Sequence, residues 1–587
     1  MKGGFDIKWF NWTSPVNFTG ADDYGVFRFN NNIQAGGTGH PFANFLLGLP
    51  TDVDQTASGP NVDGVAMHYG FFAQDEWRLN SRVTLSLGLR YELRPPFEDR
   101  EENISNFLRE TPNGDVVVPS QSSIGLTAPG FGGSIGTSRI LAADEIGYPK
   151  SLRFTDKNNV EPRLGIAWRP GGDNRTVVRG GYGIYHARIL GQVFNSLTGI
   201  HTSDNVTFLN TFNAGPRTYA IVWPNTYAGD PSRGVTRVGT QNFSTANDPH
   251  YKDPMTQQWS ATVERELGGR QAVRITYSGF HSDDLTLAPD LNQIAPNTIG
   301  FANLPLDARP FPNWSRINTR DNGGYQDYHD VVFQVRGNLT SWGLSQTTTY
   351  KWAHSIDNIE DRGAGQSDFQ TEINGRTDNR FDPDYLRGAT TNIPTHRFVS
   401  SAIWMLPIGR GRKYGTDMPV AVDALAGGWA ISTLVQVQSG AHLTAFYSSH
   451  CGSGTNCYGS EKADAVAGQG PNGGPQTLAQ WFNTSAFSIG AFRDSQGRSI
   501  FAGRFGDAEK GSIVGPGAWN VDFAAFKDVK LGTRATARVN VFVTNLFNHP
   551  NWGRPEMNLT SANYGRITSL SPIFPLRTIV LGGRITY

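Results

Sequence analysis

Residues 82–91, RVTLSLGLRY, alternate strictly between two kinds of side chain. The odd-numbered positions are apolar or aromatic: Val83, Leu85, Leu87, Leu89 and Tyr91. The even-numbered positions are polar or small, and they include Arg82 and Arg90. A period of two residues is that of a β-strand, whose successive side chains point to opposite faces. The stretch therefore predicts a strand with one continuous apolar face and one charged face.

The same alternation recurs along the chain. Apolar residues are spaced by two in residues 273–277, 331–339, 429–437, 539–543 and 579–587. Arginines lie on the opposite face of four of these segments: Arg274, Arg336, Arg538 and Arg584. The segments are bounded by Gly, Pro, Asn and Asp, which are typical of turns. The pattern predicts an all-β protein with about fourteen to sixteen strands of roughly ten residues.

Two architectures produce this signal. A soluble β-sandwich or propeller buries the apolar face, whereas a transmembrane barrel turns the apolar face to lipid and the polar face to a wet lumen. The strand length and the aromatic residues near strand ends favour the barrel. Those aromatic residues are Trp77, Tyr91, Trp168, Trp352, Trp404 and Tyr587. The sequence therefore predicts a transmembrane antiparallel β-barrel with long extracellular loops.

The connections between predicted strands differ greatly in length. Gly268 and Gly269 form a short link, whereas residues 97–160, 190–250 and 355–392 are long polar excursions. Short periplasmic turns and long external loops are typical of outer-membrane barrels. We therefore expect the long excursions at the external end.

The composition limits the classes of protein that fit. The chain has 587 residues with 51 Lys+Arg and 51 Asp+Glu, so no overall basic field favours a nucleic-acid partner. Charged residues make up 17% and aromatic residues 12%, which argues against both a disordered chain and an ordinary helical protein. No run approaches the roughly 18 apolar residues of a transmembrane helix. The amino terminus lacks the apolar core of a signal peptide, so either the protein is cytosolic or Met1 is not the natural start.

The two cysteines, Cys451 and Cys457, lie in the Gly/Ser-rich run HCGSGTNCYGS. Their spacing suits a local disulfide in an oxidising compartment, and the alternative is a pair of unpaired loop thiols. His450 is adjacent, but a zinc site needs about four ligands and no second ligand pair is evident. We expect no metal site.

The sequence carries no convergent catalytic pattern. Gly132, Ser134 and Gly136 match G-x-S-x-G, but a nucleophile elbow lies between a strand and a helix, and these residues lie in a Gly-rich stretch. H-E-x-x-H and P-loop patterns do not occur. We therefore expect no enzymatic activity and no cofactor.

Five aromatic residues lie in segments that are predicted to face outside: Trp314, Tyr325, Tyr328, Tyr447 and Tyr458. Such rings stack on sugars or on planar chelates, so they are candidate external-loop contacts for a solute. The alternative is that they pack within the loops or anchor the barrel in the membrane interface.

Several segments, in this order, resemble the carboxy-terminal barrel of Oar-like TonB-dependent outer-membrane receptors, a group common in acidobacteria and related Gram-negative bacteria. They include GHPFANFLLGLP (39–50), YGFFAQDEWRLNSRVTLSLGLRY (69–91), EPRLGIAWRP (161–170), HRFVSSAIWMLPIGRGRKY (396–414) and NVFVTNLFNHPNWGRP (540–555). The resemblance covers nearly the whole chain. It implies that residues 1–587 are the barrel domain, the carboxy-terminal portion of a receptor with a barrel of roughly 22 strands. In that family a signal peptide, an Ig-like domain, a TonB-contact segment and a plug precede this portion, and none is visible in the chain.

The resemblance also implies a function and a set of partners. The barrel would lie in the outer membrane, bind a siderophore, oligosaccharide or peptide at its external loops, and act with TonB-ExbB-ExbD through the amino-terminal region. The last strand resembles the signal that the barrel-assembly machinery recognises, through Leu581, Gly583, Ile585 and Tyr587. The alternative function is a surface adhesion or secretion-linked outer-membrane barrel without solute transport.

Overall fold

The computed structural model describes most of the chain. The described residues are 1–14, 26–30, 37–55, 62–127, 131–172, 175–188, 197, 206–210, 212–213, 218–219, 221–222, 243–295, 308–339, 342–359, 376–377, 379–391, 393–448, 460–489, 505–531 and 534–587. Cys451, Cys457 and Tyr458 lie outside these residues, so the predicted disulfide and the predicted Tyr458 contact stay predictions.

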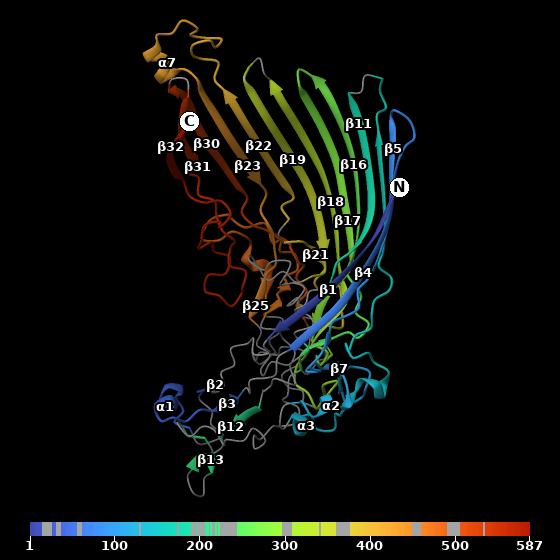
Figure 1. Ribbon diagram of the computed structural model, residues 1–587. Helices are drawn as coiled ribbons and strands as arrows, with labels where there is room; N and C mark the ends of the chain where they lie inside the picture. The colour runs from blue at the N-terminus through green and yellow to red at the C-terminus, as the bar shows by residue number, and fades with distance from the viewer. Residues whose placement is uncertain are drawn as a thin grey trace.

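One large antiparallel sheet, here called the wall, dominates the structure (Figure 1). Its strands pair in the following order: β1 (Lys2–Ser14), β4 (Val62–Arg78), β5 (Val83–Leu93), β10 (Val160–Trp168), β11 (Thr176–His186), β16 (Met255–Gly268), β17 (Gln271–Pro289), β18 (Ile317–Leu339), β19 (Leu344–Asp357), β22 (His396–Met405), β23 (Trp429–Gln438), β30 (Ala518–Leu531), β31 (Ala535–Thr544) and β32 (Thr578–Thr586). All six segments in which the sequence alternates coincide with these strands, apart from the terminal residues Arg82 and Tyr587, so that prediction is confirmed.

The connections sort by length between the two ends of the wall (Figure 1). Short turns at residues 79–82, 169–175, 269–270, 340–343 and 532–534, together with the longer turn 406–428, lie at one end, here called the short-turn end. Every connection at the other end, the loop end, is long, and these include the predicted excursions 97–160, 190–250 and 355–392. Gly268, Gly269 and Arg270 all have positive φ in the tightest turn, a conformation that glycine adopts without strain.

The apolar face of the wall is exposed. Leu89 of β5 has 53% of its surface exposed and Trp9 of β1 has 68%, and the same holds for apolar residues of most other strands. Aromatic side chains near the short-turn end also lie on the surface: Trp77, Trp168, Trp342 and Trp404. A soluble sandwich would bury this face, whereas a membrane barrel presents it to lipid with aromatic residues at the interfaces.

The two outermost strands of the wall are β1 and β32, the first and last in the pairing order. Among the described strands, no register joins β32 to β1 or to β4. The wall is therefore an open curved sheet (Figure 1). Unpaired backbone groups at a sheet edge are costly in lipid, so each of these edges requires a hydrogen-bonding partner in a membrane.

The long connections fold into small elements at the loop end instead of forming featureless loops. Toward the amino-terminal half these are β2 (Val26–Arg28), α1 (Pro41–Leu46), β3 (Asp52–Gln55), β6 (Glu98–Asp99), β7 (Asn106–Leu108), β8 (Asp115–Val118), α2 (Gln121–Ile124), α3 (Phe131–Ser134), β9 (Ile140–Ala142), η1 (Ala143–Ile146), β12 (Val206–Leu209), β13 (Phe212–Asn213), β14 (Thr218–Tyr219) and β15 (Phe243–Asn247). Further along they are β20 (Arg376–Thr377), β21 (Gly388–Ala389), β24 (His442–Leu443), β25 (Phe446–Ser448), β26 (Ser460–Lys462), β27 (Asp464–Ala465), η7 (Thr484–Ala486), β28 (Phe487–Ser488) and β29 (Ile513–Val514). At the short-turn end α7 (Val420–Ala426) lies in the turn 406–428.

Among the described residues four hydrophobic cores hold these elements together, and the two largest are named here. The Trp314 core consists of Phe107, Val116, Val118, Phe131, Ile135, Phe243, Ala246, Leu291, Phe311, Trp314 and Ile317. The Phe482 core consists of Leu443, Ala445, Ala463, Phe482, Ala486, Phe487, Ala508, Ile513 and Met557. Both draw on segments far apart in sequence, so the long connections form a packed layer over the loop end. None of the helices among the described residues has the length and apolar character needed to cross a membrane.

Candidate functional site on the polar face

The face opposite the exposed apolar residues, here called the polar face, carries ion pairs between neighbouring strands. Arg274 of β17 donates to Glu264 of β16 at 2.6 Å. Arg538 of β31 donates to Asp528 of β30 at 2.7 Å. The two residues of each pair lie directly opposite each other in register, and opposite charges in that position stabilise a sheet modestly. The arginines that the alternation placed opposite the apolar face therefore belong to a polar wall.

Three hollows follow one another along β4, β5 and β10 from the loop end to the short-turn end. The first, of about 310 Å³, is lined by Asp6, Lys8, His68, Tyr69, Gly70, Glu92, Arg94, His186 and Arg188. The second, of about 230 Å³, is lined by Phe72, Ala73, Gln74, Gly88, Leu89, Arg90 and Arg163. The third, of about 370 Å³, is lined by Met1, Lys2, Gln74, Asp75, Glu76, Ser86, Leu87, Gly88, Arg163, Leu164 and Gly165. The second and third hollows share Gln74, Gly88 and Arg163, and the first lies next to the second along β4 and β5, where Gly70 and Glu92 are two residues from Phe72 and Arg90. The three hollows are together called the charged groove.

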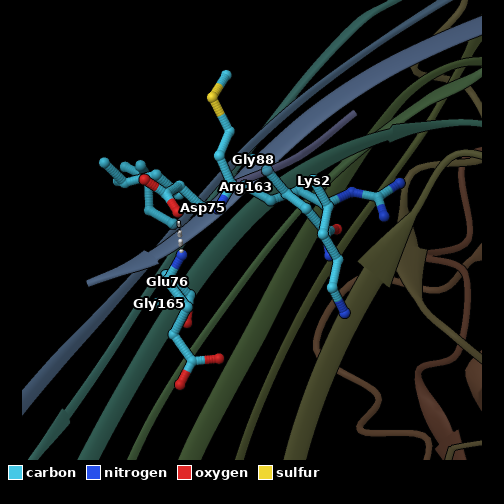
Figure 2. A pocket seen from close by; sticks show the side chains of 11 residues that line it. Lys2, Asp75, Glu76, Gly88, Arg163 and Gly165 are labelled. Atoms are coloured by element: carbon cyan, nitrogen blue, oxygen red, sulfur yellow. Dashed lines mark hydrogen bonds and ion pairs between the residues drawn. The ribbon is translucent and has the colours of Figure 1, made fainter. Parts of the chain in front are cut away.

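Small residues make the floor of the charged groove. Ser86, Gly88 and Gly165 lie on adjacent strands, and Gly165 pairs with Ser86 in register. A side chain at Gly88 would contact only the Cβ atoms of Arg163 and Gln74 and one backbone oxygen, each at 3.7 Å or more, so the floor is open there. Figure 2 shows Lys2 and Arg163 extending to the same side of the strands beside Gly88. The sequence thus leaves space between long charged side chains.

Gly70 has a definite role in the first hollow. A Cβ atom at this position would lie 2.7 Å from Nη2 of Arg90 and closer still to the carboxylate of Asp6. Arg90 Nη2 donates to Asp6 Oδ1 at 2.9 Å, and the pair crosses over Gly70 from β5 to β1. Only glycine leaves room for this contact, because any larger residue must displace one of the two charged groups.

Cationic side chains outnumber acidic ones along the charged groove. The cations are Lys2, Lys8, Arg90, Arg94, Arg163 and Arg188, and the acids are Asp6, Asp75, Glu76 and Glu92. The middle hollow contains two arginines, Arg90 and Arg163, and no acid. A groove with this balance attracts anionic groups such as carboxylates, which arginine binds in a bidentate manner.

A buried ionic cluster fixes the loop end of the charged groove. Arg94 follows β5 and is almost fully buried. Its Nη1 donates to Asp253 Oδ2 at 3.0 Å, its Nε donates to Glu92 at 2.6 Å, and its Nη2 donates to the carbonyl oxygen of His186 at 3.1 Å. Glu161 of β10 completes the cluster, accepting from the backbone N–H of His186 at 3.0 Å. The contacts join β5, β10, β11 and the segment before β16.

Burial raises the pKa of Asp253 above its ordinary value, although Arg94 and Arg153 oppose the shift. Asn159 Nδ2 also donates to Asp253 Oδ2, at 3.0 Å. The carboxylate is thus held by an amide and a guanidinium away from water. Buried charges of this kind are stable only while their partners remain in place.

The sequence did not single out Arg94, Glu161, His186 or Asp253. Each lies at or just outside the end of a strand of the wall, and their contacts span 25 to 159 positions of sequence. The available signal was charge on the polar face near strand ends, which does not identify partners. The regular geometry of β-pairing shows that these ends meet only when the order of the strands is known.

The aromatic residues predicted as solute contacts have different surroundings. Trp314 is fully buried at the centre of the Trp314 core, and Tyr447 is fully buried in β25. Neither ring is accessible to a solute in this structure, because both pack within the loops. Trp314 Nε1 donates to the carbonyl oxygen of Gly114 at 2.9 Å, which satisfies its one polar atom.

Tyr325 and Tyr328 lie in the wall strand β18, so the prediction that they lie in a loop is wrong. The Gly323–Gly324 pair resembles a turn, but the strand continues through it with an irregular register in which Gly324 opposes Leu285. Tyr328 stacks on Phe280 with ring centroids 5.0 Å apart, and its hydroxyl donates to Asp330 at 2.7 Å. Both tyrosines remain half-buried, and their contact with a solute stays a prediction.

The G-x-S-x-G match has a local structural explanation. Ser134 is buried in α3, and its hydroxyl donates to the carbonyl oxygen of Phe131 at 2.7 Å, so the G-x-S-x-G match lies in a packed turn. Among the described residues, no three His, Cys, Asp or Glu side chains are grouped so as to hold a metal ion.

The final strand presents the residues of the predicted assembly signal on an exposed edge strand. Leu581 and Gly583 of β32 pair with Val541 and Val539 of β31. Leu581 and Ile585 are exposed on the apolar face, and Tyr587 is exposed at the end of the strand. The strand therefore offers an apolar side and an edge that lies in register with no other described strand, and its recognition stays a prediction.

Asp290 provides a pH-dependent element beside the Trp314 core. Its carboxylate accepts from the backbone N–H groups of Ile317 and Asn292, both at 2.9 Å. Burial raises its pKa to about 6, against the opposing effect of these bonds. Since the folded pKa exceeds that of the unfolded chain, this group's stabilisation is complete below about pH 4 and is lost as the pH rises through 6.

We therefore expect the segment around Asp290 to lose about 3 kcal/mol of local stability between pH 4 and pH 7. Hydrogen exchange of residues 290–295 and 308–317 measures this loss. Asp290→Asn keeps both accepting contacts and removes the titration, so the variant should show no such loss over this range. An identical pH profile in the variant would contradict the assignment.

An antiparallel wall with an exposed apolar face, a polar opposite face, short turns at one end and long connections at the other defines a class of protein, the outer-membrane β-barrels. The chain belongs to the outer membrane beta barrel domain family, whose model matches residues 1–579. This membership assigns the chain to the outer membrane, with its apolar face toward lipid and its polar face toward the lumen. No curated protein matches the sequence.

Solved structures with a similar arrangement are outer-membrane proteins of very different sequence. The outer membrane transporter YddB from Escherichia coli is 9% identical with a TM-score of 0.40, over 89% of this chain and 54% of that chain. BauA, the ferric preacinetobactin receptor from Acinetobacter baumannii, is 9% identical with a TM-score of 0.38, over 89% and 43%. The FrpB iron transporter from Neisseria meningitidis (F3-3 variant) is 11% identical with a TM-score of 0.38, over 91% and 46%. The chain spans about half the length of these structures.

Proposed function

We propose that the chain is the barrel part of an Oar-like TonB-dependent receptor that takes up a solute bearing anionic groups, the loop layer being the external end. The observation that carries the proposal is the charged groove, which runs along the lumen side of β4, β5 and β10 from below the loop layer to the short-turn end. A barrel that only anchored adhesive loops would not need a continuous line of cations in its lumen.

The chemistry of the groove narrows the solute class. Arg90 and Arg163 lie together in the middle hollow. Arg90 is paired with Asp6 and Glu92 and Arg163 with Glu161, and because a guanidinium has five N–H donors these pairs use only part of its capacity. Charge-assisted hydrogen bonds from arginine to a carboxylate are among the stronger polar contacts, about 1.5–3 kcal/mol each. We therefore favour a solute with carboxylates, such as a carboxylate siderophore or an acidic peptide, over a neutral oligosaccharide. Energy from TonB-ExbB-ExbD and insertion by the barrel-assembly machinery belong to the same proposal.

Substitution in the groove tests the proposal. In the bacterium that carries the natural gene, Arg163→Gln should lower uptake of the cognate solute by about tenfold, the effect of losing one charge-assisted contact. Arg163 is 46% exposed, and its buried partner Glu161 keeps the backbone N–H of His186 and the nearby Arg94, so the substitution should leave the amount of folded protein unchanged. Radiolabelled uptake and heat-modifiable migration measure the two quantities.

Arg538→Gln is the matched control, because Arg538 lies on the same face in β31, far along the pairing order from the groove. Uptake should be unchanged in this variant. If deletion of the gene abolishes attachment to surfaces or to other cells and leaves uptake of every tested siderophore and peptide intact, the adhesion alternative replaces the proposal.

A further inference from the structure

The turn 406–428, between β22 and β23, is the longest connection at the short-turn end. It carries α7, whose sequence VAVDALA has a single charged residue, Asp423. Val420, Val422 and Leu425 are exposed, Leu425 to 79%. A short helix that shows apolar side chains outward is unfavourable in water, so its surroundings in the membrane-embedded protein must be apolar in part.

The position of α7 relative to the wall identifies those surroundings. Trp404 lies opposite Ile431 on the exposed apolar face, and Trp429 and Lys527 lie opposite each other two residues further along the same face. Lys527 is nevertheless only 6% exposed. Its Nζ donates to the carbonyl oxygen of Asp423 at 2.6 Å and to that of Gly427. The carboxyl end of α7 thus covers a lysine of the lipid-facing side, which locates α7 on that side.

This contact is favourable in two ways. The carbonyl groups at the carboxyl end of a helix carry partial negative charge, so the ammonium group of Lys527 stabilises this end of α7. The contact also removes a cation from contact with hydrocarbon, where it would be costly. α7 is therefore fixed to β30 with its apolar side chains free to face outward.

Cations and amphipathic aromatic residues surround the helix. Arg410, Arg412 and Lys413 are all exposed. Lys413 Nζ lies 5.9 Å from the ring centroid of Trp342 and 5.4 Å from that of Tyr414. Trp404 Nε1 donates to the carbonyl oxygen of Trp342 at 3.0 Å, which connects this group to the aromatic residues at the end of β22.

The acidic residues of the turn do not cancel these cations. Asp423 is directed inward, where its Oδ1 accepts from the backbone N–H of Arg410 at 2.7 Å. Asp417 is the other acid in the turn, so three exposed cations are set against one exposed carboxylate. Such a surface is complementary to anionic phosphate groups, and tryptophan and tyrosine favour the depth at which lipid headgroups lie.

We propose that the turn 406–428, together with Trp342, is an interfacial anchor that binds anionic phospholipid headgroups in the leaflet at the short-turn end. α7 lies in the plane of the interface with Val420, Val422 and Leu425 toward the acyl chains, and Arg410, Arg412 and Lys413 contact phosphates. Lipid is the occupant because the surface is continuous with the apolar face of β22 and β23 and carries the opposite charge to anionic headgroups. The proposal is independent of any solute.

Hydrogen exchange in nanodiscs of stated composition tests the anchor on the full chain. For the wild type, amides of residues 418–428 should exchange about tenfold more slowly in bilayers with 30% phosphatidylglycerol than in pure phosphatidylcholine, as expected for a few cations near an anionic surface. Arg412→Gln combined with Lys413→Gln should abolish the difference. Both side chains are exposed, so the substitution should leave heat-modifiable migration intact.

The matched control is Arg336→Gln combined with Arg538→Gln, which removes the same charge from the polar face of the wall. This control should retain the full lipid dependence. Equal exchange in the two lipids for the wild type, or equal loss of the dependence in both double variants, would overturn the proposal. Protection that appears in both lipids only as protein concentration rises would assign the surface to a second copy of the chain instead.

Discussion

Trp314→Ala should unfold much of the loop layer while leaving the wall intact. The indole ring is fully buried and packs against Phe107 and Phe243 with centroid distances of 5.5 and 5.8 Å. Its Nε1 donates to Gly114, 200 positions away, and to Ser138 Oγ at 3.2 Å. Removing a buried tryptophan costs about 3–5 kcal/mol, which is comparable to the stability of a small packed unit.

The measurement is hydrogen exchange of residues 106–118 and 243–247, which should accelerate by at least about a hundredfold in the variant. Strands β22, β23, β30 and β31 do not contribute to the Trp314 core and should keep their protection. Trp342→Ala is the control, because its ring is 67% exposed and its loss creates no cavity. Unchanged exchange around residue 106 in Trp314→Ala would mean that the layer does not depend on this core.

The wall was predictable from the sequence because its signal is local. In residues 82–91 every second side chain is apolar, and the structure exposes that face and directs Arg90 to the other side. The period of the alternation and the face to which each side chain points can both be inferred without knowing the partner strand. The short link at Gly268 and Gly269 was readable for the same reason, since positive φ at glycine is a property of single residues.

The packed loop layer was not predictable in this way. Phe107, Phe243 and Trp314 meet in one core although neighbouring members are about 70 to 140 positions apart along the chain, and no periodicity marks them. Because Pro, Asn and Ser flank Trp314 in the sequence, the sequence predicts that it is an exposed ligand contact. Only the strand order of the wall brings the three connections over the same end, and this order is a long-range property.

The candidate site was likewise predictable only where its signal is local. Arg90 was identified as a residue of the polar face, whereas its pairing with Asp6 depends on Gly70 between them. The buried Arg94 gave no signal, because a single arginine after a predicted strand resembles any solvated loop residue. Its importance follows from burial and from Asp253, neither of which the local sequence reveals.

Arg94→Leu should cause the second large loss of stability, and Asp253 determines whether this loss grows or shrinks as the pH rises. Loss of Arg94 leaves the buried carboxylates of Asp253 and Glu161 without their shared cation, and breaking a buried ion pair in this way costs about 3–5 kcal/mol. The pKa of Asp253, already raised by burial, should rise further, because Arg94 is the largest influence that lowers it. A raised folded pKa means that stability is lost as the pH increases, so Arg94→Leu should be nearer to the wild type at pH 5 than at pH 8.

Urea unfolding in detergent at the two pH values measures the difference. Adding Asp253→Asn to Arg94→Leu should recover most of the stability at pH 8 and remove its pH dependence, because the amide retains the bond from Asn159 and carries no charge. Asp253→Asn alone leaves Arg94 paired with Glu92 and should cost less than Arg94→Leu. If Arg94→Leu is equally unstable at pH 5 and pH 8 and the second substitution gives no recovery, the loss comes from packing of the arginine stem, and the ionic cluster does not organise the loop end of the groove.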